Sequence, residues 1–209
     1  MGRFKKEHLT FLLRRLHSVS GIVPVGAFLL IHLYKNSHAL LGEEAYNKMV
    51  EGIHSLPLLL SMEILGIWLP ILYHGIYGIV LVFGAKSNVT KYPQYFNNWM
   101  YTLQRWSGMV AFAFIIWHFW GTWMQSYLYG AKVEFSMMSD IANSPWQLTL
   151  YIIGIGAAVY HLANGVWTFG ITWGVLVGPR SQRVVHVISL LAGLVLFLIS
   201  VKVLFAFRV

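Results

Sequence analysis

Five long apolar stretches, separated by short polar segments, organise the chain. An α-helix needs roughly 20 apolar residues to cross the ~30 Å hydrocarbon core of a bilayer, and each stretch is long enough to do so. We therefore expect an all-α integral membrane protein with five transmembrane helices, I to V, in a single domain over residues 1–209. The five stretches cover approximately residues 12–36, 57–84, 100–125, 146–174 and 184–207.

The first stretch predicts a retained helix rather than a cleaved leader. Basic residues precede it, but residues 16–34 form a run without a charge that is too long for a signal peptide, and no small-residue cleavage site follows. A short amphipathic helix is expected in the next loop, where Leu41, Ala45, Met49 and Ile53 recur every four residues.

Composition and charge agree with a membrane protein. Hydrophobic residues make up 57% of the chain and charged residues 11%. Ten of the 15 Lys and Arg residues, among them Arg3, Lys5 and Lys6, lie on one side, namely before or at the start of helix I, around loop II–III and in loop IV–V. The positive-inside rule therefore places the N-terminus in the cytoplasm and the C-terminus outside. The net charge of +8 reports this topology rather than nucleic-acid binding.

A repeated histidine motif is the main candidate for chemistry. Residues 72–78 (LYHGIYG) return 87 residues later as residues 159–165 (VYHLANG), and both follow the pattern Tyr-His-x-x-x-Gly. A Ser-Gly pair followed by a histidine also recurs, with His32 in helix I and His118 in helix III, 86 residues apart. Helices I–II and III–IV therefore look like two copies of one hairpin, to which helix V is added.

Both copies begin on the cytoplasmic side, so the repeats are parallel and their pseudo-two-fold axis should follow the membrane normal. Such an axis places equivalent residues at equal depth, facing each other across the bundle. The expected pairs are His32 with His118, near the outer side, and His74 with His161, nearer the cytoplasm. Two facing imidazoles, with Gly75, Gly78 and Gly165 nearby to admit a flat ring, are what a six-coordinate haem requires.

Two other interpretations of the histidines were weighed. A single membrane histidine often serves only as a hydrogen-bond donor between helices. Zinc is the other metal to consider, but no Cys, Asp or Glu lies at ligand spacing with these histidines. The chain has no Cys, which excludes covalent haem attachment and iron–sulfur clusters on this chain. The sequence thus predicts a dihaem four-helix bundle with two non-covalent haems b.

Further candidates lie around these pairs. Glu63 is the one acidic residue within a span, and it lies eleven residues before His74, close to three helical turns, so we expect it on the face of His74. An intramembrane carboxyl near a redox centre is a candidate quinone or proton site. Arg15, His17 and Arg105 are candidate partners of haem propionates. His186, like the other histidines at predicted helix ends, is expected to be solvated.

The chain resembles the five-helix, dihaem cytochrome b558 anchor of bacterial succinate dehydrogenase, and the resemblance covers essentially the whole sequence. Single motifs would be weak, but together they are specific. The residues that carry it are FLLRRLHS at 11–18, IVPVG at 22–26, His32, LPILYHGIYG at 69–78, NWM at 98–100, LQR at 103–105, WH at 117–118, YH at 160–161, NG at 164–165, TWG at 172–174 and PRSQR at 179–183.

This resemblance implies an anchor in the bacterial plasma membrane that docks a flavoprotein subunit and an iron–sulfur subunit on its cytoplasmic face. It implies that electrons pass through two b haems to menaquinone, with His74 and His161 on the haem of higher potential and His32 and His118 on the outer haem. One alternative is the anchor of a quinol:fumarate reductase, a similar complex that catalyses the reverse reaction. The other is a transporter whose buried histidines relay protons.

Overall fold

The computed structural model describes residues 2–208, with side chains from residue 7 onward, and within this range every regular element is a helix. The side chains of Arg3, Lys5 and Lys6, which were counted for topology, lie outside the described set. Helix I is a continuous run of α1 (Gly2–Ser20), η1 (Gly21–Gly26) and α2 (Ala27–Ser37), and helix II consists of α4 (Leu59–Glu63), η3 (Ile64–Trp68) and α5 (Leu69–Phe83). Helices III to V are α6 (Phe96–Gly121), α9 (Pro145–Thr172) and α10 (Pro179–Ala206).

Long helices coincide with all five apolar stretches. Four runs in the described part of the chain, Glu7–Leu41, Leu59–Phe83, Pro145–Thr172 and Pro179–Ala206, have both the length and the hydropathy of a membrane span. Helix α6 has 26 residues, about 39 Å at 1.5 Å per residue, but its polar first half lowers its hydropathy. Its role as the fifth span therefore stays a prediction.

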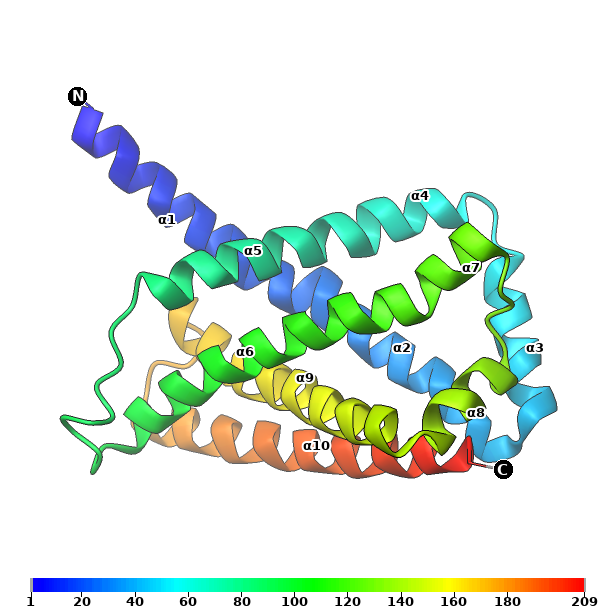
Figure 1. Cartoon of the computed structure of the whole chain (residues 1–209). Coiled ribbons are helices and arrows are strands. Elements are labelled where there is room, and N and C mark those ends of the chain that lie inside the picture. Colours follow the sequence, from blue (N-terminus) through cyan, green and yellow to red (C-terminus); the bar gives the residue numbers. More distant parts are fainter. Residues whose placement is uncertain (1, 209) are drawn as a thin grey trace.

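The helices run between two ends of an elongated bundle (Figure 1). The N-terminus and the loops at residues 84–95 and 173–178 lie at one end, and α3 (Glu43–His54), α8 (Phe135–Asn143) and the C-terminus lie at the other. Helix α9 packs against both α6 and α10, while α5 contacts α1 and α6. This arrangement places the chain termini at opposite ends, as an odd number of crossings requires.

The outer surface of the long helices is apolar. On α10, the side chains of Leu191, Val195 and Leu198 are each more than half exposed. Contiguous exposed apolar surface of this extent marks an interaction with lipid or another protein. Inside the bundle the packing includes histidine, tyrosine and glycine, so the polar groups of the spans lie between helices.

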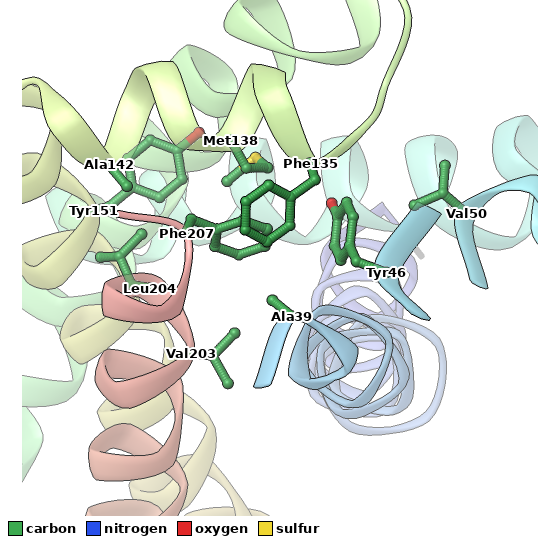
Figure 2. Packing of buried hydrophobic residues seen from close by; sticks show 10 residues of the cluster. All are labelled: Ala39, Tyr46, Val50, Phe135, Met138, Ala142, Tyr151, Val203, Leu204 and Phe207. Carbon is green, nitrogen blue, oxygen red and sulfur yellow. The ribbon is translucent and has the colours of Figure 1, made fainter. Parts of the chain in front are cut away.

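A buried cluster closes the end of the bundle that holds the C-terminus (Figure 2). Phe207 is its centre, because its ring lies 5.0 Å from the Tyr46 ring and 4.9 Å from the Phe135 ring. Burial raises the pKa of the Tyr46 hydroxyl to about 12, so this side chain remains neutral. We call this set the outer cluster; its buried members are Ala39, Tyr46, Val50, Phe135, Met138, Ala142, Tyr151, Val203, Leu204 and Phe207.

The short helix expected in the first outer loop is present as α3, after the single turn η2 (His38–Leu41). Its buried face is shifted by one residue from the predicted stripe, because Tyr46 and Val50 are buried while Leu41 is 75% exposed. The reason is that Tyr46 packs inward against Phe135 and Phe207, which belong to other elements. Two outer helices that hydropathy did not predict, α7 (Trp123–Tyr129) and α8, complete this end.

Removing the Phe207 ring should destabilise this end of the protein. Truncation of a fully buried phenylalanine costs about 3–5 kcal/mol, since it leaves a cavity, and Phe207 is 1% exposed. We expect Phe207→Ala to lower the free energy of unfolding by that amount in detergent micelles, measured by denaturant titration. Phe205→Ala is the matched control, because Phe205 is 45% exposed; equal losses in both variants would contradict the role of the outer cluster.

Candidate functional site

Four histidines meet as two pairs inside the bundle. The ring centroids of His32 and His118 are 5.7 Å apart, and those of His74 and His161 are 6.0 Å apart. Both pairs have an interplanar angle of 77°. The structure thus brings together the two pairs that the repeat predicts, and the two pairs have similar mutual geometry.

Backbone carbonyls orient the pair of His74 and His161, which we call the inner pair. The Nδ1 atom of His74 lies 3.0 Å from the carbonyl oxygen of His17, and Nδ1 of His161 lies 2.9 Å from that of Gln104. A carbonyl only accepts, so each Nδ1 carries the proton and donates it. Each Nε2 then keeps its lone pair, which is the arrangement of a metal-binding imidazole.

The rest of the Tyr-His-x-x-x-Gly motif joins helix II to helix I and helix IV to helix III. The hydroxyl of Tyr73 donates to the carbonyl of Leu13 at 2.8 Å, and that of Tyr160 donates to the sulfur of Met100 at 3.6 Å. Leu13 and Met100 are also 87 residues apart. The tyrosine of each motif therefore sets the position of the histidine that follows it.

Glycines admit the groups around the inner pair, although not as the sequence suggested. A Cβ on Gly108 would lie 2.7 Å from Cε1 of His161, and one on Gly21 would meet the His74 ring in the same way. The predicted glycines face other groups. Gly78 and Gly165 face His17 and Gln104, the residues whose carbonyls bind the histidines, and Gly75 faces the ring of Phe112. The glycine that touches each histidine thus lies on the neighbouring helix, and the expectation that Gly75, Gly78 and Gly165 make room for a flat ring stays a prediction.

The pair of His32 and His118, which we call the outer pair, is supported differently. Nδ1 of His118 lies 2.9 Å from the hydroxyl oxygen of Tyr151. Phenylalanines one turn earlier pack on both rings, with centroids 5.4 Å apart for Phe28 and His32 and 5.7 Å apart for Phe114 and His118. The two histidines of the outer pair therefore have the same aromatic packing but not the same hydrogen bonds.

A π-helical turn accounts for the unequal repeat spacing. The inner histidines and the glycines Gly21 and Gly108 are separated by 87 residues, yet His32 and His118 are separated by 86. Between Gly21 and His32, helix I contains the π segment η1, whereas α6 is regular between Gly108 and His118. A π turn encloses one residue more than an α turn, so η1 absorbs the extra residue. Pro24 within η1 lacks the N–H that a regular helix needs there.

Glu63 lies in a polar group beside the outer pair. Trp123 donates its indole N–H to a Glu63 carboxylate oxygen at 3.0 Å. The ammonium group of Lys35 acts electrostatically on Glu63 and on both outer histidines. The expected alignment of Glu63 with the face of His74 assumed an uninterrupted α-helix, but the π segment η3 intervenes and turns Glu63 by roughly one residue, about 100°.

The three candidate propionate partners are placed differently. The His17 ring stacks on the His74 ring, with centroids 4.1 Å apart, and its Nδ1 is buried without a partner among the described residues. Arg15 donates to the carbonyl of Thr172 and lies over the Trp173 ring. Arg105 contacts the Tyr101 ring and hydroxyl on its own helix. Of the three, His17 is the one that lies directly beside the inner pair.

Several functional residues were missed from the sequence. Lys35 was counted only as a topology marker, and Gln104, Tyr151 and Trp123 were not singled out. His17 and Gln104 lie at equivalent positions of the two repeats, 87 residues apart, and this spacing was a usable signal. The contact of Tyr151 with His118 joins two different helices, so no sequence pattern indicated it. His186 was expected to be solvated, but it is 7% exposed, because it packs between the rings of Trp167 and Phe96.

The geometry fits a metal ion held between two imidazoles. Two imidazoles that share one metal through bonds of about 2 Å have ring centroids roughly 6 Å apart. Both pairs meet this distance, and glycines keep the rings of the inner pair clear of side-chain atoms. In the described part of the chain, no three His, Cys, Asp or Glu side chains gather as ligands. A cofactor that supplies the remaining ligands, as haem does, is therefore the group that these pairs suit.

Comparisons with known proteins point to one family. The family described as "Succinate dehydrogenase/Fumarate reductase transmembrane subunit" matches residues 83–200. A curated relative, the succinate dehydrogenase cytochrome b558 subunit of Bacillus subtilis (strain 168), is 42% identical over 197 residues, which cover 94% of this chain and 96% of the relative. The match to the relative therefore extends over most of both repeats.

The contact between Gly108 and His161 yields a specific prediction. Because a methyl group at Gly108 would meet the His161 ring at 2.7 Å, Gly108→Ala should displace this ring and lower occupancy of the inner site at least several-fold, measured as pyridine haemochrome per polypeptide. Gly121→Ala on the same helix is the control, since nothing lies within 4 Å of a Cβ there. Full occupancy in the Gly108→Ala protein would contradict the close packing.

Proposed function

The chain belongs to the family of succinate dehydrogenase/fumarate reductase transmembrane subunits, and from this premise we propose that it binds two haems b and carries electrons to menaquinone. The two oriented histidine pairs are the observation that supports this proposal most directly. His74 and His161 would hold one haem, and His32 and His118 would hold the other. Haem supplies reversible one-electron chemistry, and the chain supplies its ligands and surroundings.

The bundle would form one cytochrome b domain over residues 1–209, with α6 as the fifth span. Helices I to IV enclose both histidine pairs, and helix V packs on α9. The two pairs lie at different depths, because His74 and His161 contact groups near the cytoplasmic ends of helices I and III. Electrons that enter at the cytoplasmic face would therefore reach the inner pair before the outer pair.

Menaquinone would bind beside the outer pair. Glu63, Lys35 and Trp123 form a polar group there, within a bundle whose other side chains at this depth are mostly apolar. Reduction of a quinone consumes two electrons and two protons, so a carboxyl and an ammonium group next to a redox centre can supply and replace protons. Glu63 is the proposed proton donor, and Lys35 is the cation near it.

The proposed partners are a flavoprotein subunit and an iron–sulfur subunit, which would dock on the cytoplasmic face of the bacterial plasma membrane. The N-terminus and the basic loops II–III and IV–V lie at the end of the bundle that this topology assigns to the cytoplasm (Figure 1). Succinate chemistry would belong to those partners. The family covers subunits of both succinate dehydrogenase and fumarate reductase, and the relative favours succinate oxidation as the physiological direction.

Loss of either inner histidine should remove the same haem. A reduced-minus-oxidised spectrum of the purified wild-type chain should show a b-type α band, with two haems per polypeptide. His74→Ala and His161→Ala should each leave one haem, and it should have the same midpoint potential in both variants, because the two ligands share one iron. Loss of different haems would rule out the pairing, and a wild-type protein without haem would favour the proton-relay transporter.

Replacing Glu63 should impair quinone chemistry without affecting the haems. In Glu63→Gln, the carbonyl oxygen can still accept from Trp123, but the side chain no longer carries a proton to donate. Menaquinone-dependent turnover of the assembled complex should fall by about 10²-fold or more, since general acids typically contribute about 10²–10⁴-fold, while both haem bands remain. Glu51→Gln, at an exposed position on α3, is the control. Turnover equal to that of the wild type would show that the role of Glu63 is structural.

A further inference from the structure

Tyr151 is a buried tyrosine that neither the repeat nor the proposed quinone group explains. It lies on α9, is 4% exposed, and places its hydroxyl oxygen 2.9 Å from Nδ1 of His118. Each inner histidine instead donates from Nδ1 to a main-chain carbonyl. His118 is thus supported by a side chain where the inner histidines are supported by the backbone.

We propose that Tyr151 is a positioning residue for the outer haem, which accepts the Nδ1 hydrogen of His118, aims Nε2 at the iron and lowers the potential of this haem. The inference rests on the proposed haem ligation. In this role Tyr151 would contact neither the haem nor the quinone, because it would act through His118.

The direction of the hydrogen bond follows from ligation. An imidazole that binds iron through Nε2 carries its remaining proton on Nδ1. The Tyr151 oxygen must then accept the hydrogen bond that Nδ1–H of His118 donates, since two donors cannot face each other. A ligand histidine whose N–H is accepted in this way becomes more basic. The more basic ligand stabilises ferric over ferrous iron, which lowers the reduction potential.

Packing holds the Tyr151 ring in place. Its centroid lies 5.2 Å from that of Phe114 and 5.5 Å from that of Trp117, both at steep angles. Phe114 also packs on the His118 ring, nearly parallel to it. Tyr151 belongs to the outer cluster, so the position of its hydroxyl is set by the same packing that closes this end of the bundle (Figure 2).

The repeat makes this support specific to one ligand. Tyr151 precedes His161 by ten residues, and Glu63 precedes His74 by eleven with the π segment η3 between them. Because the π segment absorbs one residue, Glu63 is the structural counterpart of Tyr151. The first repeat therefore has a carboxylate bound to Trp123 at this position, and the second has a phenol bound to a histidine. The outer haem would have chemically different support on its two sides.

The test is Tyr151→Phe in the assembled complex, which keeps the ring and removes only the acceptor. Redox titration followed by the haem α bands, together with low-temperature EPR of the ferric haems, measures both sites separately. We expect two haems, a higher midpoint potential and an altered low-spin EPR signal for the outer haem, and an unchanged inner haem. Tyr34→Phe is the control, because Tyr34 lies at similar depth on α2 and is 65% exposed; it should change neither haem.

An outer haem with the wild-type potential and EPR signal in Tyr151→Phe would overturn the proposal and leave Tyr151 as a packing residue. Loss of the outer haem alone in Tyr151→Phe would support the positioning role, because this variant keeps the ring and removes only the hydroxyl group; loss of both haems would overturn the proposal, because it would indicate a general effect on folding. A wild-type complex without haem would refute the proposed function itself, so the two failures are distinguishable.

Discussion

The Nδ1–H groups of the inner histidines need acceptors inside the bundle, because the hydrocarbon around the protein offers none. An unsatisfied polar group in such an environment costs several kcal/mol. For His74 and His161, the acceptor is a carbonyl of the preceding helix, at His17 or Gln104. This single contact sets how helix II lies on helix I and helix IV on helix III, and it leaves Nε2 free for a metal. The Tyr-His-x-x-x-Gly motif is the local sequence that this docking requires, since its tyrosine and glycine bring the two helices together at the same place.

The two ends of the bundle depart from symmetry to different degrees. Around the inner pair, the two repeats agree in the carbonyls, in the glycine that faces each ring, and in serines Ser20 and Ser107, which donate to those carbonyls. Around the outer pair, prolines and π segments in the first repeat have no counterpart within α6 or the interior of α9. Glu63, Lys35 and Tyr151 lie at this end of the bundle, near the outer pair. The two repeats are thus most alike around the inner pair, and they differ most around the outer pair.

Hydropathy and repeat spacing were sufficient to predict the five long helices, the short helix in the first outer loop and the two histidine pairs. These features depend on period and depth, which a parallel repeat in a membrane leaves little freedom to vary. Hydropathy and spacing did not predict which side chain of one helix meets which of another. Gly75, Gly78 and Gly165 face Phe112, His17 and Gln104. His186 is buried by Trp167 and Phe96, although its position near a helix end suggested exposure.

The sequence by itself determined that this is a helical membrane protein with four paired histidines, because apolar length, charge asymmetry and an 87-residue period are properties of the linear chain. Only the tertiary structure decided which atoms hold those histidines, and that Lys35 and Tyr151 belong with the outer pair. The physical reason is that one extra residue in a π turn rotates everything beyond it by about 100°. A turn of this kind changes which groups Glu63 faces without changing hydropathy, so only the contacts between helices reveal it.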